Sequence, residues 1–333
     1  MDELLVKDIG EHGLLQRLQS FCPPDVVGDD GAILAIAPNR SLVVTTDVLV
    51  DGVHFSDRTT SPFDVGWRAA AANLSDLAAM GAKPLGITVG LSLPGTVAVS
   101  WVEGVYQGMS ACLAADQTPL VGGDICRSTV ASLAITALGE VLPQQAICRH
   151  AARPGDVIVA TGCHGRSRGG LELLLNPELA DILELQERSR LIEAHQRPKP
   201  RLDVLPHLRE IAPEMAIAGM DSSDGLADAV RQICRRSGVG AVLNRSNIEI
   251  DPGLTKLVGQ ETAWSWVLNG GEDFELLLCL PEPFAQQLVA RLGHDAAMIG
   301  TITAAPEITV VDPDGLANGE NLALAEGFQH FSS

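Results

Sequence analysis

Acidic residues set among glycines, hydroxyls and aliphatic residues are the main chemistry-bearing feature of this sequence. The stretches are VGDDGAI (Asp29, Asp30), VVTTDVL (Asp47), NLSDLAAMGA (Asp76), LVGGDIC (Asp124), GMDSSDGLA (Asp221, Asp224) and NGGEDFEL (Glu272, Asp273). Each alone is typical of a turn, since aspartate beside glycine often caps one. Together they favour another interpretation, because converging carboxylates repel each other unless cations join them. We expect Mg²⁺, which binds through a few carboxylates while substrate phosphates complete its shell.

Asp76 has the most unusual surroundings of these acids. The segment VGWRAAAANLSDLAAMGA is nearly uncharged on both faces at helical spacing, which predicts a buried helix. Ser61 as cap, Pro62 at the first helical position and Gly81 at the end predict a helix over 61–81. A lone buried carboxylate is costly unless it is paired, protonated or bound to a metal. Taken alone, Asp76 is equally well explained as a neutral acid or a cap for a nearby loop.

Several common catalytic motifs are missing from the sequence. It contains no GxxxxGK[ST] phosphate loop, no GxGxxG after a strand, no HExxH, no zinc-type Cys/His spacing and no GxSxG. Hydride transfer, zinc-dependent hydrolysis and serine hydrolase chemistry therefore have no support. What remains is phosphate chemistry carried out with metals held by carboxylates.

Composition narrows the possible partners. The 333 residues carry a formal net charge of -19 and only 4% aromatic residues, which disfavours nucleic-acid binding. The N-terminal MDELLVKDIGEH is charged, unlike a signal peptide, and no apolar run reaches the roughly 18 residues of a membrane span. The seven cysteines are scattered and contain no CxxC, so a reduced, cytoplasmic protein is expected.

Hydrophobic periodicity predicts two α/β domains in series. In the first half, strands are predicted at 32–37, 42–46, 85–93 and 132–138, and helices at 61–81 and 97–115. In the second half, a strand is predicted within 153–162; helices are predicted near 169–175, 182–194, 201–210 and 223–236, and strands near 240–243, 275–280, 297–303 and 307–312. The best boundary lies within 142–152, so we predict an N-terminal domain at 1–148, with a mixed sheet, and a C-terminal domain at 149–333.

One predicted strand carries polar residues where it ends. Residues 42–44 are expected in the core, followed at the strand tip by Thr45, Thr46 and Asp47. Strand tips are where α/β folds place their ligands. Beyond this tip, Asp51 with Gly52 is typical of a turn.

The motifs resemble those of the thiamine-monophosphate kinase family, within the superfamily that includes aminoimidazole ribonucleotide synthetase and selenophosphate synthetase. The matching stretches are GDD at 28–30, TTD at 45–47, VDGVHF at 50–55, NLSDLAAMGAKP at 73–84, VGGD at 121–124, RPGD at 153–156, RPKPR at 197–201, DSSDGL at 221–226, NGGEDFEL at 269–276 and GFQHF at 327–331. They span nearly the whole chain in order.

The resemblance implies ATP-dependent phosphorylation of thiamine monophosphate to thiamine diphosphate. It also implies a homodimer through an intermolecular barrel of the first halves, helices on one face of each N-terminal sheet, and an active site between the halves. The implied Mg²⁺ ligands are Asp30, Thr45, Thr46, Asp47, Asp76, Asp124, Asp221 and Asp224. The implied ATP contacts are Tyr106, Gly123, Asp124, Arg149 and Ser223. The implied substrate contacts are His54, Glu272 and Phe328.

Three positions differ from the usual family pattern. Ser222 stands where an aliphatic residue is usual, and Ile125-Cys126 where threonines are common. Arg166 stands where an acid is common. Arg166 and Arg168 are interpreted as exposed loop arginines, with contact to ATP phosphates as the alternative.

A phosphate acceptor sets the chemistry to be expected. Its second pKa is about 6, so at pH 7 the attacking oxygen is already largely deprotonated and no general base is required. The difficulty is the approach of two anions, which cations must screen while the protein positions them. His54 is expected to hydrogen-bond the acceptor phosphate and Phe328 to pack on the thiamine rings.

Two rival functions stay open on sequence alone. Another enzyme of the superfamily is the nearer one, although Cys22 precedes Pro23-Pro24, which is unsuited to the reactive cysteine of selenophosphate synthetase. The other is a non-catalytic, cation-binding acidic protein, for which a local D-x-D-x-D-G loop would be expected, and the chain has none.

Overall fold

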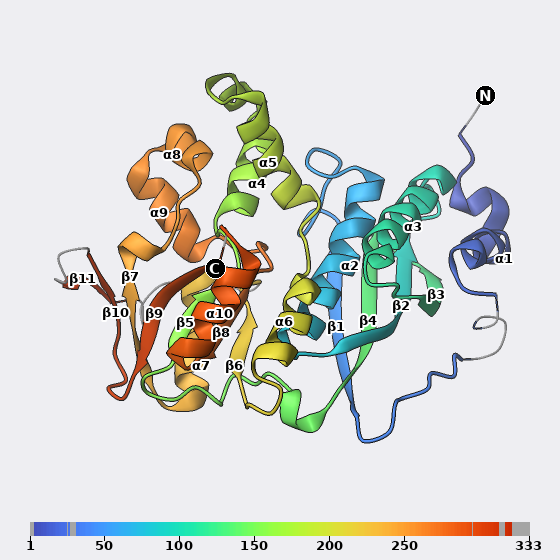
Figure 1. Ribbon diagram of the computed structural model, residues 1–333. Coiled ribbons are helices and arrows are strands. Elements are labelled where there is room, and N and C mark those ends of the chain that lie inside the picture. Colours follow the sequence, from blue (N-terminus) through green and yellow to red (C-terminus); the bar gives the residue numbers. More distant parts are fainter. Residues whose placement is uncertain (1–2, 25, 27–30, 295, 313–316, 322–333) are drawn as a thin grey trace. The chain divides into compact units, whose positions relative to one another are not determined.

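The chain folds into two compact units. The structure is a computed structural model that describes residues 3–24, 26, 31–294, 296–312 and 317–321 (Figure 1). Unit 1 consists of Met1–Leu77 and Ala82–Val141, and unit 2 consists of Ala78–Gly81 and Leu142–Ser333. The prediction of two α/β domains with a mixed N-terminal sheet is confirmed.

Unit 1 is built on a mixed four-stranded sheet. Its strands and helices are α1 (Val6–Leu18), β1 (Ser41–Val50), α2 (Pro62–Ala79), β2 (Lys83–Leu93), α3 (Val99–Ala114), β3 (Leu120–Arg127) and β4 (Ser132–Val141). The strand order is β1-β4-β2-β3, with β4 antiparallel to β1 and β2, and β3 parallel to β2. β1 and β3 are therefore the two edges. The strand predicted at 32–37 is wrong, because those residues form no strand ladder.

Strand β1 differs from its prediction in length and in burial. It continues to Val50, so Thr45, Thr46 and Asp47 lie in its middle and not at its tip. The core prediction for 42–44 is also wrong: Leu42 and Val44 are 47% and 57% exposed. Successive side chains of a strand alternate between faces, so these two and Val48 share the face opposite to Thr45 and Asp47.

Helix α2 begins as predicted and packs unusually close to α3 (Figure 1). The Ser61 hydroxyl donates to the Asp64 carboxylate at 2.6 Å and accepts from the Asp64 amide at 3.3 Å, a capping arrangement. A Cβ added to Gly66 would lie 1.8 Å from the carbonyl oxygen of Val105, and one added to Gly108 the same distance from that of Phe63. Only glycine permits this backbone approach, which fixes α2 against α3.

Unit 2 contains a larger mixed sheet with helices. Its strands are β5 (Val157–Ala160), β6 (Ala218–Asp221), β7 (Gly240–Asn244), β8 (Leu276–Leu280), β9 (Ala297–Thr303), β10 (Ile308–Val311) and β11 (Ala317–Asn321), in the order β11-β10-β7-β9-β5-β8-β6. Its helices are α4 (Arg166–Leu175), α5 (Leu185–Gln196), α6 (Val204–Ile211), α7 (Leu226–Ser237), α8 (Pro252–Val258), α9 (Gln260–Asn269) and α10 (Glu282–Leu292). The sequence missed β6, β11, α8, α9 and α10, and it missed α1 and β3 in unit 1.

The core of unit 2 brings three loops together at one end of adjacent strands. Strand β8 is buried along its whole length and lies between β5 and β6, antiparallel to both. The loop after β5, the loop after β6 and the loop before β8 therefore meet at the same end of these three strands. These loops carry the stretches TGCHGRS, DSSDGL and NGGEDFEL.

Two expectations from composition concern the thiols, expected to be reduced, and the membrane span, expected to be absent. All seven cysteines are free, and Cys112, Cys163, Cys234 and Cys279 are buried. Among the described residues, no helix combines the length and the apolar character needed to cross a membrane.

Candidate functional site

In unit 1, residues of α2 meet the middle of β1 at a group of oxygen-bearing side chains. The Thr45 hydroxyl donates a hydrogen bond to the Asp76 carboxylate. The amide of Asp47 donates to the side-chain carbonyl of Asn73 at 3.1 Å. Thr45 and Asp47 lie two residues apart on one face of β1, and Asn73 and Asp76 lie one turn apart on α2. Contact between this strand face and this helical turn therefore brings the four residues together. Thr46 points to the other face, with its hydroxyl 2.9 Å from that of Thr136.

Asp124 lies apart from that group within unit 1. It is an exposed residue of β3, the edge opposite β1. Three strand spacings separate these edges, about 14 Å. Its neighbour Gly123 allows close strand pairing, because a Cβ there would lie 2.2 Å from the carbonyl oxygen of Val89. Unit 1 therefore holds its predicted acidic ligands in two places.

Tyr106 is a core residue of α3. Its ring packs against Phe21 with centroids 5.6 Å apart, and burial raises the pKa of its hydroxyl, which stays protonated. Its contact with ATP stays a prediction.

His54 is held in one orientation by the strand that precedes it. The amide of Val50 donates to its Nδ1 at 3.1 Å, and its backbone carbonyl accepts from Arg68 at 3.3 Å. A nitrogen that accepts carries no proton, so the neutral ring has its N–H at Nε2. Such a group donates to anions. Asp51 is exposed in the turn beside Gly52, whose φ is +77°.

In unit 2, Asp221 and Asp224 flank two serines after β6. Asp221 is buried and accepts from the Ser223 hydroxyl at 3.4 Å, whereas Asp224 is exposed. The backbone carbonyl of Ser223 accepts from the amide of Glu272 at 2.7 Å. This bond ties the DSSDGL loop to the NGGEDFEL loop.

The NGGEDFEL loop has backbone geometry that side chains rarely adopt. Glu272 and Phe274 have φ values of +65° and +52°, which cost energy for residues other than glycine. Between them, the buried Asp273 carboxylate accepts from the amides of Gly165 at 2.6 Å and Ser167 at 2.9 Å, at the N-terminus of α4. These bonds hold the strained loop. Glu272 is left partly exposed at its surface.

His195 of α5 lies behind Glu272. Its Nδ1 is 3.1 Å from the Ser167 hydroxyl and 3.9 Å from the Glu272 carboxylate. The imidazole of His195 is buried, so it approaches the Glu272 carboxylate from the interior of unit 2.

Arginines of this unit are paired with buried acids. Arg201 donates to the carboxylate of Glu275 at 2.5 Å and to the carbonyl of Thr161 at 2.6 Å. Arg166 and Arg190 donate to Asp251, which is fully buried, at 2.8 Å and 2.7 Å. A buried carboxylate with two guanidinium partners is a structural ion group.

The interpretation of Arg166 and Arg168 as exposed loop arginines is therefore wrong. Both belong to α4. Arg168 stacks 4.7 Å from the centre of the Trp266 ring and pairs with Glu172 at 2.9 Å. Their contact with ATP phosphates stays an untested alternative.

Three further predicted residues lie outside these groups. Arg149 is exposed and donates to Gln232 at 2.6 Å. Asp30 and Phe328 lie outside the described residues. Five further residues take part in these groups and were not predicted from the sequence: Asn73, His164, Ser167, His195 and Arg201. Only Asn73 and Arg201 lie inside motifs, NLSD and RPKPR, that could have indicated them.

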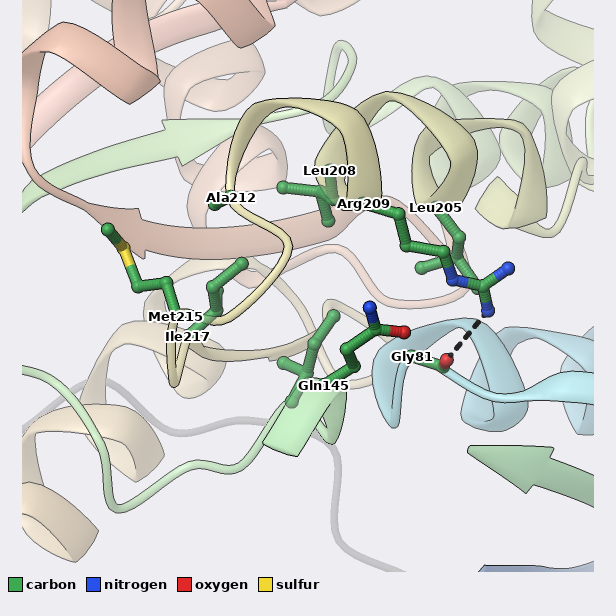
Figure 2. A pocket seen from close by; sticks show the side chains of 9 residues that line it. Gly81, Gln145, Leu205, Leu208, Arg209, Ala212, Met215 and Ile217 are labelled. Carbon is green, nitrogen blue, oxygen red and sulfur yellow. Dashed lines mark hydrogen bonds between the residues drawn. The ribbon is translucent and has the colours of Figure 1, made fainter. Parts of the chain in front are cut away.

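A small cavity of unit 2 contains none of the predicted site residues. Its lining is mostly aliphatic, and Arg209 at its rim donates to the carbonyl of Gly81 at 3.2 Å (Figure 2). The lining residues are Gly81, Gln145, Ile147, Leu205, Leu208, Arg209, Ala212, Met215 and Ile217. Without an acid or a nucleophile it offers no chemistry, so the acid groups are the better candidate site.

The acid groups offer oxygen donors of the kind that Mg²⁺ binds. No group of three or more His, Cys, Asp or Glu side chains arranged for a metal is found in the described part of the chain. Mg²⁺ is usually held by one or two carboxylates together with substrate phosphates and water. Asp76 beside the Thr45 hydroxyl, and Asp221 beside the Ser223 hydroxyl, each supply a carboxylate with a second oxygen donor. The donor chemistry therefore fits this ion.

Family models assign both units to one class of protein. Residues 28–141 match the N-terminal domain of AIR synthase related proteins, and residues 153–313 match the C-terminal domain. Two such domains in series, each with acidic loops, define a member of the AIR synthase related class.

Within this class, similarity extends over whole chains. Thiamine-monophosphate kinase of Synechococcus elongatus is 50% identical over 100% of both chains. The crystal structure of thiamine-monophosphate kinase from Stenotrophomonas maltophilia is 35% identical, with a TM-score of 0.79 over 91% of this chain and 96% of that one. A structure of AaThiL complexed with AMPPCP and TMP is 31% identical, with a TM-score of 0.75 over 98% of both chains. The chain belongs to the thiamine-monophosphate kinase family.

Proposed function

We propose that this protein transfers the terminal phosphoryl group of ATP to the phosphate of thiamine monophosphate, giving thiamine diphosphate and ADP. The observation that carries this proposal is the full-length match, at 50% identity, to a thiamine-monophosphate kinase. The acidic groups of both units agree with it, because they suit cation-assisted phosphoryl transfer.

The residues at the site explain how such a transfer proceeds without a base. The acceptor phosphate oxygen is already largely ionised near neutral pH, so it needs no side chain to remove a proton. The protein must instead bring two anions into line. His54, with its N–H at Nε2, is suited to donate to the acceptor phosphate.

Magnesium is the cation that we propose for the acidic groups. Asp47 and Asp76 with Thr45 in unit 1, and Asp221 and Asp224 in unit 2, would hold it; Thr46, Asp124 and Asp30 belong to the same proposed set. When bound, Mg²⁺ neutralises charge on the phosphates. The donors on the protein are all oxygens, which is what this ion prefers.

The remaining contacts are proposed from the same family pattern. Gly123, Asp124, Arg149, Ser223 and Tyr106 are the proposed contacts to ATP. Glu272 and Phe328 are the proposed contacts to the thiamine part of the substrate. The strained backbone at Glu272 supports its role, since such strain clusters at functional sites.

Product analysis tests the proposed function. The purified chain is incubated with ATP, MgCl₂ and thiamine monophosphate, and the products are separated by chromatography. Thiamine diphosphate and ADP in equal amounts are expected. Thiamine, replacing the monophosphate, is the control acceptor. ATP hydrolysis without thiamine diphosphate would point to another enzyme of the class, and no ATP turnover would point to a non-catalytic protein.

A homodimer in the cytoplasm is the proposed assembly. Leu42, Val44 and Val48 form an exposed apolar row on the sheet face of unit 1 opposite α2. Exposed apolar rows of this kind mark interaction surfaces. Joining β3 of one copy to β1 of another would close two four-stranded sheets into a barrel. Asp124 of one copy would then lie on a strand next to the one that carries Thr46 in the other copy.

A further inference from the structure

Three loops of unit 2 form a junction through hydrogen bonds of their backbones and of one carboxylate. The Ser222 amide donates to the carbonyl of Glu275 at 2.8 Å, and the Glu272 amide donates to the carbonyl of Ser223 at 2.7 Å. The Gly165 amide donates to the carboxylate of Asp273 at 2.6 Å. Each loop is thus bonded to another one, and Asp221 and Asp224 are carried by the middle loop.

A buried pair of polar side chains lies at this junction. Nε2 of His164 is 3.0 Å from the hydroxyl of Ser222, and the two residues are 3% and 0% exposed. Burial lowers the pKa of His164 to about 4, although a hydrogen bond to the backbone of Gly162 opposes this. The imidazole is therefore neutral near pH 7.

The neutral ring can make this hydrogen bond in either tautomer. Nε2 of His164 accepts from the Ser222 hydroxyl when it carries no proton, and donates to it when it carries one. In both cases each side chain of the pair has a partner in the other.

Ser222 is fixed at three points. Its hydroxyl is hydrogen-bonded to His164, its amide donates to the carbonyl of Glu275 and its carbonyl accepts from the amide of Gly225 at 3.1 Å. The residue before it is Asp221 and the second residue after it is Asp224. The contacts that hold Ser222 therefore orient the carboxylates of Asp221 and Asp224.

Neither side chain of the pair belongs to the proposed ligand set. Burying a hydroxyl and an imidazole without partners would cost free energy that two apolar side chains would not. The pair is thus a local feature of this chain that needs an explanation.

We propose that His164 and Ser222 act together as positioning residues that hold Asp221 and Asp224 in the geometry for binding a divalent cation. The cation role rests on the proposed function; the fixing of the loop by the pair does not. Neither residue touches the reacting atoms, so their effect is on affinity for the cation and not on the chemistry itself.

Four variants of the full-length chain separate this role from plain stability. Ser222→Ala and His164→Leu each leave one buried partner unsatisfied. The double variant His164→Leu with Ser222→Val replaces the pair by apolar side chains. Val310→Ala removes a buried side chain on β10, near the other end of the same sheet, and serves as the matched destabilising control.

Two measurements are made on each variant. Calorimetric titration with MgCl₂, at saturating non-hydrolysable ATP analogue, gives the dissociation constant of the ion. Hydrogen exchange gives the protection of amides 221–225, and it does not depend on any activity. Each single variant is expected to weaken Mg²⁺ binding by about tenfold or more, as for residues that orient metal ligands, and to speed exchange of these amides. The double variant is expected to recover most of the Mg²⁺ affinity and most of the protection of these amides.

Two results would overturn the positioning role. Single variants that behave like Val310→Ala, less stable but with wild-type Mg²⁺ affinity and protected amides at 221–225, would overturn the positioning role. A double variant showing the sum of the single effects would show that the residues do not act as a pair, and would equally overturn it. If the wild-type chain makes no thiamine diphosphate, the proposed function fails, while the exchange data still decide whether the pair fixes the loop.

Discussion

The hydroxyl of Thr45 on β1 donates a hydrogen bond to the carboxylate of Asp76 on α2. This contact joins the strand and the helix that carry the proposed Mg²⁺ ligands of unit 1. A carboxylate that accepts such a bond is held in one orientation, which is what a metal ligand requires.

Asp76→Ala and Asp47→Ala are expected to abolish turnover and to leave the fold intact, because each removes a charged ligand from a partly exposed position. Thr45→Val keeps the shape of the side chain but loses the hydroxyl, and about a 10- to 100-fold loss is expected. Turnover is measured at saturating MgCl₂, and folding by circular dichroism. A wild-type rate for either aspartate variant would remove that residue from the ligand set.

His54→Ala is expected to raise the KM for thiamine monophosphate by about 10- to 100-fold, with a smaller effect on the KM for ATP. The reason is the loss of a donor to a charged phosphate, worth about 1.5–3 kcal/mol. Initial rates are measured with each substrate varied in turn. His12→Ala changes an exposed histidine of α1 and serves as the control. Equal changes in both KM values, or none, would exclude His54 from the acceptor site.

Val44→Asp is expected to convert the proposed dimer into a monomer, because it introduces a charge into the apolar row on β1. Light scattering after gel filtration gives the mass in solution, with the wild-type chain expected at twice 35.1 kDa. Val53→Asp, at another exposed valine outside the strand, is expected to stay dimeric. A monomeric wild-type chain would contradict the proposed assembly.

The contribution of His164 to the stability of unit 2 is expected to fall as the pH drops from about 6.5 to about 4. His164 has its pKa lowered to about 4 in the folded chain, so the unfolded chain binds the proton more readily in this window. This contribution is complete above pH 6.5, and about 3 kcal/mol is the largest loss that this one group can cause.

Urea unfolding at a series of pH values measures this dependence. The double variant His164→Leu with Ser222→Val lacks the titrating group, so its stability should decline less over the same window. Parallel pH profiles for the variant and the wild-type chain would show that His164 does not contribute.

Sequence reasoning succeeded where a long periodic pattern was present. The helix that carries Asp76 was predicted because its cap, its apolar faces and its terminal glycine agree with one another. The strand at 32–37 was wrong because an apolar run forms a strand only if a neighbour pairs with it, and the sequence does not name that neighbour.

The errors at β1 and β3 have related causes. Polar residues at 45–47 were interpreted as the end of a strand, but β1 continues through them, since β4 pairs with it along its whole length. The Gly122–Asp124 stretch was interpreted as a turn, whereas it lies inside β3, where Gly123 is needed for close approach to β2. The pairing of His164 with Ser222 could not be foreseen, because 58 residues separate them and both lie in loops.

The glycine contacts between α2 and α3 have a consequence for tolerance to mutation. Gly66 lies ten residues before Asp76 on one helix, about 15 Å along its axis. Even a methyl group at Gly66 or Gly108 would meet a carbonyl oxygen of the other helix, so α2 would have to move as a rigid rod. Asn73 and Asp76 would move with it and leave their partners on β1. Substitutions at these two glycines would therefore inactivate the enzyme from a distance, in a chain that still folds.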